Sequence, residues 1–184
     1  MPTPTLVDAD VPRGRALHLV DLENLLQGTH EDAGVEDATW ALSRFCRKAD
    51  WHRDDLVVVA ANPGLLGRIA YDLPRGWQKV AAAGADGADR ALLERAEPGL
   101  VRHRFYRLVV GSGDGIFADL AEAVRDAGGE VWVVGVGGHV SRRLARSAST
   151  LVLLDEPAAP GAVRRCRHDR VDRRPVTAAR YPRA

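Results

Sequence analysis

The stretch RFYRLVVGSGDGIFADLAEAVRDAGGEVWVVGVG, residues 104–137, decides the fold class of this chain. Residues 104–113 contain an apolar run that ends in small residues, which predicts a buried strand. Residues 114–129 are amphipathic and end in two glycines, which predicts a helix with a glycine stop. Residues 130–137 form a second apolar run. Two strands joined through a helix indicate a parallel β-α-β unit.

The same alternation extends on both sides of this unit. Apolar runs predict further strands at 16–21, 55–62, 77–83 and 150–155. Helical spacing predicts helices at 37–49, 63–73, 87–97 and 141–148, with Asp37 and Ser141 as N-caps and Pro63 in a first turn. Strands that are apolar almost throughout are typical of parallel sheets buried on both faces. The sequence therefore predicts an α/β fold: a Rossmann-like three-layer sandwich with a mostly parallel sheet.

Length and charge suggest one domain with two tails. The 184 residues are 46% hydrophobic and 28% charged, and the formal net charge is only +1. We expect an N-terminal tail at 1–14, a domain at 15–156 and an Arg-rich, disordered tail at 157–184. Residues 161–184 hold eight arginines and two aspartates. Such an end either attracts phosphates non-specifically or only keeps the protein in solution.

The sequence shows no sign of a disulfide framework or of a membrane. Its two cysteines, Cys46 and Cys166, form no metal-binding or disulfide pattern, and Cys46 lies in an apolar helical pattern that predicts a small core residue. No apolar run reaches about 20 residues, and the first residues lack the layout of a signal peptide. We therefore expect a cytoplasmic protein without a membrane partner.

Acids and amides follow the predicted strands. Asp21 ends the first strand, with Glu23 and Asn24 just after it; later strands are followed by Asp86, Asp89, Ser112, Asp114 and Asp119. Ligands of open parallel sheets bind outside the carboxyl ends of the strands. Carboxylates crowded there repel one another unless a cation or protons neutralise them. Mg²⁺ or Mn²⁺, which prefer oxygen ligands, would do so.

Each acid also has a purely structural interpretation. The roles of helix cap or solvated helix residue remain open for Asp86, Asp89, Asp114 and Asp119. Glu23 could be a first-turn acid that matches the helix dipole. Asp21 is hardest to explain in this way, because burying a lone charge at the end of an apolar strand is costly.

Three stretches together resemble the NYN domains of the PIN-like group. HLVDLENLLQG (18–28) resembles their opening motif, and GADRALLERA (87–96) their middle motif. Residues 108–155 resemble their C-terminal half, in which SGD precedes a helix, a strand, a short helix and a last strand. The resemblance covers residues 16 to about 155.

The resemblance implies a PIN-like fold and a Mg²⁺- or Mn²⁺-dependent ribonuclease. By position, Asp21, Asp89 and Asp114 match the acids that hold the metal. Asn24 and Ser112 match the polar residues that support them. Asp86, Glu23 or Asp119 could assist, Glu23 or Asp119 by orienting the attacking water. RNA would contact the basic side chains of Arg142, Arg143, Arg164 and Arg165.

The chain departs from this family at two positions. Ile116 occupies the place where members commonly carry a second acid, and Asp119 could replace it from the next turn. Arg95 also stands where an acid is common, with Glu94 one position away. A thinner acid set favours the main alternative, a catalytically weak or inactive RNA-binding or regulatory module. A phosphohydrolase or nucleotide-binding enzyme of another α/β fold, a DNA substrate and a homodimer also remain open.

Overall fold

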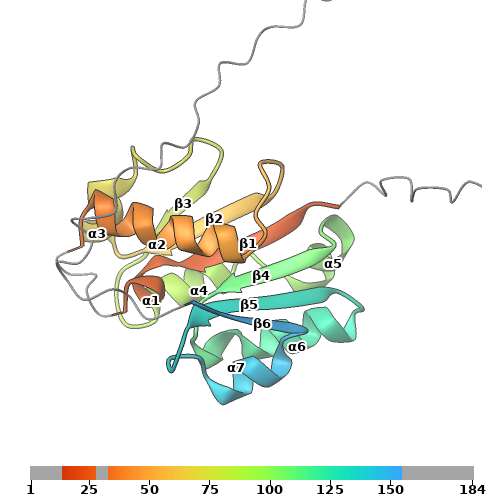
Figure 1. Ribbon diagram of the computed structural model, residues 1–184. Helices are drawn as coiled ribbons and strands as arrows, with labels where there is room; N and C mark the ends of the chain where they lie inside the picture. The colour runs from red at the N-terminus through yellow and green to blue at the C-terminus, as the bar shows by residue number, and fades with distance from the viewer. Residues whose placement is uncertain (1–13, 28–32, 155–184) are drawn as a thin grey trace, which may run out of the picture.

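A computed structural model of the chain describes residues 14–27 and 33–154. Its centre is a six-stranded parallel sheet, in the order β3-β2-β1-β4-β5-β6 (Figure 1). The strands are β1 Ala16–Asp21, β2 Leu56–Ala61, β3 Gln78–Ala81, β4 Arg107–Gly111, β5 Glu130–Val136 and β6 Thr150–Leu154. Every pairing is parallel, so the predicted fold class is confirmed.

The order of the strands reverses beside β1. The chain runs outward from β1 through β2 to β3, then returns to pair β4 with the other side of β1. All six residues of β1 are buried, as expected for a central strand covered on both faces. The carboxyl ends of β1 and β4 therefore form the switch point at which such sheets bind ligands.

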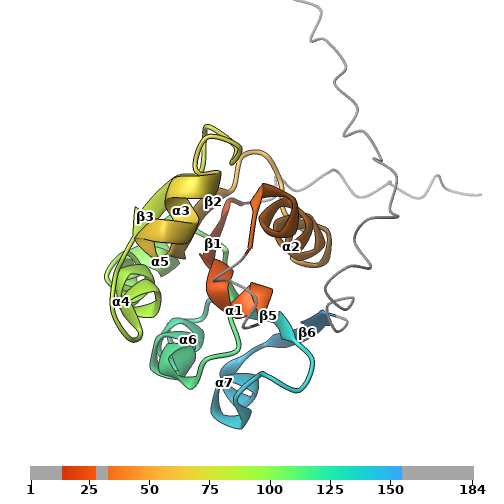
Figure 2. The ribbon, with the colours of Figure 1, turned by 90° about the vertical axis from the view of Figure 1, so that its left-hand side faces the viewer.

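Helices cover both faces of the sheet and make two apolar cores. One core packs α1 (Leu22–Leu26), α2 (Val35–Lys48) and α3 (Pro63–Ile69) against one face of the sheet. The other packs α4 (Gly87–Leu93), α5 (Pro98–Arg104), α6 (Ala118–Asp126) and α7 (Arg142–Ser147) against the opposite face. Figure 2 shows the two layers end-on, with the short helix α1 between them at the edge of the sheet. This arrangement is the predicted three-layer sandwich.

Several predicted boundaries were wrong for local reasons. Helix α2 begins after Gly34, and Asp37 accepts the Gly34 N–H from inside the first turn instead of occupying the N-cap. The predicted start of α7 was right, since Ser141 is its N-cap residue, but the Ser141 side chain makes no capping hydrogen bond. Helix α3 ends at Ile69, because residues 70–73 form turns rather than a continued helix.

Two short helices were missed. Helix α1 follows β1 without a linker, so the sequence gives no turn signal between them. Helix α5 carries a first-turn proline and a Glu97 cap, which accepts the N–H groups of Gly99 and Leu100. Its seven residues are too few to show a clear helical period, and the prediction began β4 three residues too early, at residue 104.

A histidine of β1 and an aspartate of the turn before β2 form a buried pair. His18 of β1 is fully buried, and its ring meets Phe45 of α2 edge-on. Its Nε2 lies 3.1 Å from Oδ2 of Asp55, whose side chain is only 2% exposed. Asp55 also accepts the backbone N–H groups of Ala16 and His52, at 2.8 Å each. This carboxylate therefore joins the start of β1 to the turn before β2.

Within the described ranges no helix is long and apolar enough to cross a membrane. The predicted tails fall almost wholly outside these ranges, as does Cys166. Cys46 is partly buried against the core of α2, as predicted, and burial raises the pKa of its thiol to about 12.

Candidate functional site

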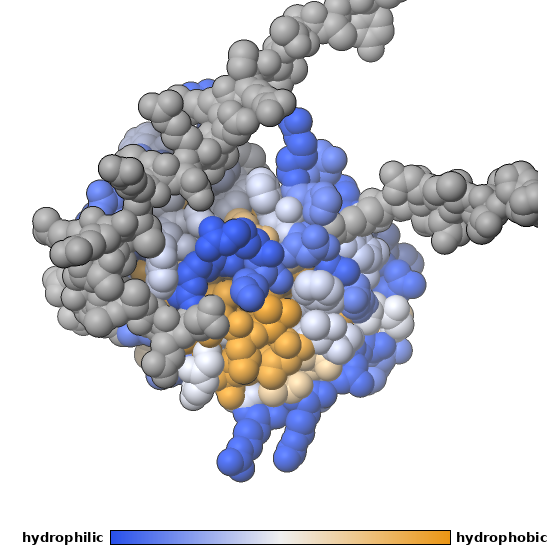
Figure 3. Space-filling model, viewed as in Figure 1, coloured by the Kyte–Doolittle hydropathy of each residue, from blue (hydrophilic) through white to orange (hydrophobic). Residues whose placement is uncertain are grey.

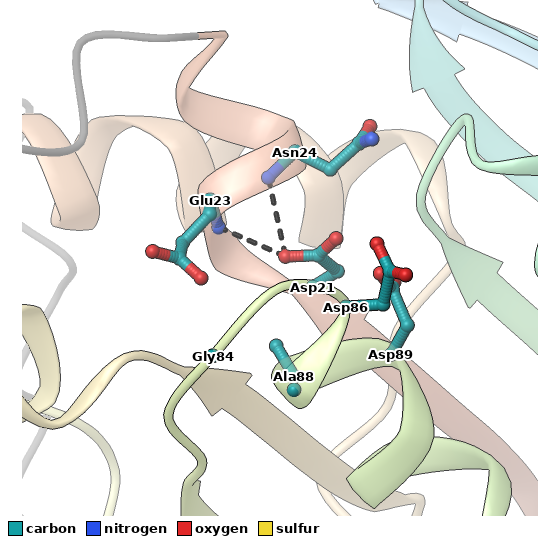
Figure 4. Close-up of a pocket in the computed structure, with 8 residues that line it drawn as sticks. Asp21, Glu23, Asn24, Gly84, Asp86, Ala88 and Asp89 are labelled. Atoms are coloured by element: carbon teal, nitrogen blue, oxygen red, sulfur yellow. Dashed lines mark hydrogen bonds between the residues drawn. The ribbon is translucent and has the colours of Figure 1, made fainter.

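An acidic pocket opens at the carboxyl end of β1, between α1 and α4 (Figure 4). Its volume is about 350 Å³. Four of the eight residues that line it are acids; the lining is Asp21, Glu23, Asn24, Gly84, Asp86, Gly87, Ala88 and Asp89. The pocket thus brings together the first and middle sequence motifs, residues 18–28 and 87–96, which are far apart in the chain.

Asp21 is both a helix cap and a pocket residue. It is 6% exposed at the end of β1, and its Oδ1 accepts the backbone N–H groups of Glu23 at 3.1 Å and Asn24 at 3.2 Å. These donors begin α1, where unpaired N–H groups favour a negative charge. The contacts fix the carboxylate at the sheet edge and face it toward Asp89 (Figure 4).

Neither acid at the start of α4 caps that helix. Asp86 is at the N-cap position in a left-handed conformation, with φ of 55°, and makes no capping hydrogen bond. Asp89 is 7% exposed within the first turn. Its Oδ1 is buried and has no hydrogen-bond partner in the described part of the chain. The interpretation of both acids as helix caps was therefore wrong. A buried carboxyl oxygen without a hydrogen-bond partner, such as Oδ1 of Asp89, needs another explanation.

Burial and mutual repulsion make these carboxyl groups hard to ionise. Burial, with the charges of Asp89 and Glu23 adding to it, raises the pKa of Asp21 to about 8. Burial also raises the pKa of Asp89; a hydrogen bond with Asp21 opposes this rise, and the charges of Asp114, Asp86 and Glu23 add to it. The pocket therefore retains a proton near neutral pH unless a cation replaces it.

The third predicted acid, Asp114, comes from the turn after β4. Its Oδ1 accepts the N–H of Ile116 at 2.9 Å, so it does cap the short helix η1 (Gly115–Phe117). Its N–H donates to Oγ of the fully buried Ser112 at 3.2 Å. Its charge acts on Asp89, which places the two acids in one electrostatic neighbourhood.

Asn24 links this turn to the first motif. Its Oδ1 accepts the N–H of Gly113 at 2.8 Å, and the carbonyl of Gly113 accepts the N–H of Ser141 at 2.8 Å. The turn that carries Asp114 is therefore held from two sides. The sequence predicted that Asn24 supports Asp21; in the structure its amide oxygen instead holds the loop that carries Asp114.

Asn62 is a positioning residue that the sequence did not single out for the site. Its Nδ2 donates to Oε1 of Glu23, and its Oδ1 accepts the N–H of Leu65 at the start of α3. The amide thus ties a pocket acid to the end of β2. An asparagine directly after a strand was the available signal, but its partner 39 residues away could not be inferred.

Other predicted residues lie apart from the pocket. Asp119 is exposed on α6 and pairs with Arg143 of α7, so it is not among the residues that line the pocket. Arg142 is exposed at the start of α7. Arg164 and Arg165 lie outside the described residues. Ile116 packs against the apolar core under α6, which explains why an apolar residue fits there in place of an acid.

Asp21 and Asp89 are the buried carboxyl groups that a hydrated divalent cation would contact in this pocket. In residues 14–27 and 33–154, no three His, Cys, Asp or Glu side chains meet closely enough to enclose a metal. Mg²⁺, however, usually takes only one or two carboxylates and keeps its remaining waters. The unpartnered oxygen of Asp89 and the raised pKa of Asp21 are the features that such a cation would satisfy.

A known crystal structure resembles the fold of this chain, but no protein-family model matches its sequence. A protein of unknown function from Vibrio parahaemolyticus has a similar crystal structure, with a TM-score of 0.58 and 20% sequence identity. The likeness covers 78% of this chain and 94% of that chain. No protein-family model and no curated protein matches this chain. At this identity the comparison supports the fold alone, and the NYN resemblance stays a prediction.

Substituting Gly113 should disturb the Asp114 turn. A Cβ atom at this position would lie 2.3 Å from the carbonyl oxygen of His139, so the backbone must move. We expect Gly113→Ala to lower the free energy of unfolding by about 1–3 kcal/mol. Urea titration measures this change in the free energy of unfolding. Gly67→Ala is the matched control, because its Cβ meets nothing within 4 Å and alanine favours helix α3. Equal stability of Gly113→Ala and wild type would contradict the clamped turn.

The stability of the metal-free protein should fall as pH rises. The folded chain binds the Asp21 proton with a pKa of about 8, whereas the ordinary value is 3.8. Because the folded state binds this proton more tightly, its stability decreases between about pH 4 and pH 8. We expect a loss of at least about 1 kcal/mol between pH 5 and pH 8 in EDTA, measured by urea unfolding. Asp21→Asn should show a flatter profile; an identical profile would contradict the assignment.

Proposed function

We propose that this chain is a Mg²⁺- or Mn²⁺-dependent ribonuclease of the PIN-like, NYN kind, which hydrolyses RNA phosphodiester bonds. The observation that carries the proposal is the buried, unpartnered Oδ1 of Asp89 beside Asp21, whose pKa is raised. Two buried carboxyl groups of this kind are rare in stable proteins unless a ligand neutralises their charge and bonds to the free oxygen. The resemblance of the three motifs to NYN domains supports RNA as the substrate.

The side chains divide into holding and positioning roles. Asp21 and Asp89, which line the pocket, would hold the cation, and the charge of Asp114 acts on Asp89 from outside the lining. The cation would supply positive charge next to the scissile phosphate, which lowers the barrier to attack by water. Glu23, which accepts a hydrogen bond from Asn62, would orient that water and accept its proton. Asn24 keeps the Asp114 turn in register.

A non-catalytic RNA-binding module is the second candidate. Two observations favour it: Ile116 is committed to the apolar core, and no three acids in the described ranges enclose a metal. In that case the same pocket would bind a cation, or a proton, without turnover. The candidates differ in one measurable property, the metal-dependent cleavage of RNA.

A cleavage assay on the full chain tests the proposal. Single-stranded and structured RNA are incubated with protein and Mn²⁺, Mg²⁺ or EDTA. We expect cleavage only with metal, and a loss of at least about 100-fold for Asp114→Asn. Asp126→Asn, a neutralised and exposed acid on α6, is the matched control and should cleave like wild type.

Cleavage that persists in EDTA would overturn the metal dependence. If folded wild type binds RNA but cleaves neither substrate with either metal, the binding module becomes the better description. Turnover of a small phosphate ester without RNA cleavage would point instead to a phosphohydrolase.

A further inference from the structure

Strand β6 forms one edge of the sheet, and its own residues carry none of the usual features that protect an edge strand. Among the described strands it pairs with β5 alone. Its five residues, TLVLL, include no charge, proline or glycine. Leu151 is 41% and Leu153 is 50% exposed. Figure 3 shows the resulting hydrophobic patch on the face of the molecule that carries β6.

The opposite edge of the same sheet is protected. Strand β3 has only four residues and includes Gln78 and Lys79. Short edge strands and lysines are the usual devices that prevent a sheet from pairing with another chain. Within the described residues, the sheet thus has one edge strand with polar residues and one edge strand that is apolar.

The side chains of β6 divide between its two faces. Val152 and Leu154 pack into the core that α2 covers. Leu151 and Leu153 point to the opposite face, and in the described part of the chain neither belongs to an apolar core. A partner strand must therefore cover two leucines and pair with one row of backbone groups.

We propose that the partner is a second copy of this chain, paired through an antiparallel β6–β6 contact. A twofold axis at Val152 places Leu151 of each copy opposite Leu153 of the other, on the same face. Thr150 then lies opposite Leu154. The strand is self-complementary in this register: both leucine pairs are apolar, and no like charges meet.

This contact would join the two sheets into one continuous sheet. Because the second copy runs in the opposite direction, the two acidic pockets would open at opposite edges. The dimer would leave both pockets accessible, so the inference does not depend on what the pockets do.

Oligomeric state as a function of concentration tests the dimer. Sedimentation equilibrium of the full chain, from about 1 to about 100 μM, should show a monomer–dimer equilibrium. Leu153→Lys should raise the dissociation constant at least about tenfold, since it places a charge in the leucine pair. Leu100→Lys, at a 49% exposed leucine of α5, should leave it unchanged. A monomer throughout, or a dimer that Leu153→Lys leaves intact, would overturn the proposal.

Disulfide cross-linking tests the register. In a Cys46→Ala, Cys166→Ala background, the double variant Leu151→Cys, Leu153→Cys places the new thiols opposite each other across the axis. We expect it to form a covalent dimer on mild oxidation. Leu153→Cys alone should not, because its thiol faces Leu151. Equal cross-linking of the single and double variants would rule out this register.

Discussion

Asp21→Asn should abolish metal-dependent RNA cleavage while leaving the protein folded. Asparagine keeps the side-chain oxygen that accepts the N–H groups of Glu23 and Asn24, so the cap of α1 survives. The substitution removes the negative charge and one of the two oxygen ligands that a cation would use. We expect cleavage to fall at least about 100-fold.

The same variant should be more stable than wild type without metal. Burial and the charge of Asp89 make the Asp21 carboxylate unfavourable above neutral pH, and the amide removes that charge. Urea unfolding at pH 8 in EDTA should give a higher free energy of unfolding for the variant. Loss of activity with gain of stability distinguishes a functional acid from a structural one. If Asp21→Asn is active, or inactive only because it unfolds, the assignment of Asp21 fails.

Asp55→Ala should cause the largest loss of stability away from the pocket. It would leave the fully buried His18 ring without its partner at Nε2, while Nδ1 already has no partner in the described residues. It would also leave the backbone N–H groups of Ala16 and His52 without their acceptor. Removing one member of a buried pair typically costs about 3–5 kcal/mol.

Urea titration at neutral pH measures this loss, with Asp54→Ala as control. Asp54 is the exposed neighbour, and we expect its replacement to change stability by less than about 0.5 kcal/mol. Although burial opposes ionisation of Asp55, hydrogen bonds from His18, Ala16 and His52 lower its pKa to about 2. Its stabilising charge is therefore present above about pH 4 and lost as pH falls toward 2. Similar stabilities of the two variants would refute a structural role for the pair.

Most of the fold could be predicted from the pattern of apolar residues. All six strands and five of the helices follow from apolar runs and helical spacing. Helices α1 and α5 could not be found in this way, because five and seven residues are too few to show a period. Their positions depend on packing against the cores.

The candidate site could be predicted in part. The parallel topology brings residues after different strands to one edge, where Asp21 and Asp89 line one pocket. Asp114 does not line that pocket, but its charge acts on Asp89. Asp119 was a reasonable candidate by position, but α6 directs it to Arg143. Its direction depends on how the helix is rotated against the sheet, which residue spacing does not define.

The sequence by itself determined the parallel sheet, its two helical layers and the edge where the acids gather. These follow from local apolar periodicity and from the order of strands and helices along the chain. Only the tertiary structure decided that Asp89 is buried with an unpartnered oxygen, that Asn62 holds Glu23, and that β6 is an exposed edge. Such properties arise from contacts between residues far apart in sequence, because burial and hydrogen-bond partners exist only once the chain is packed.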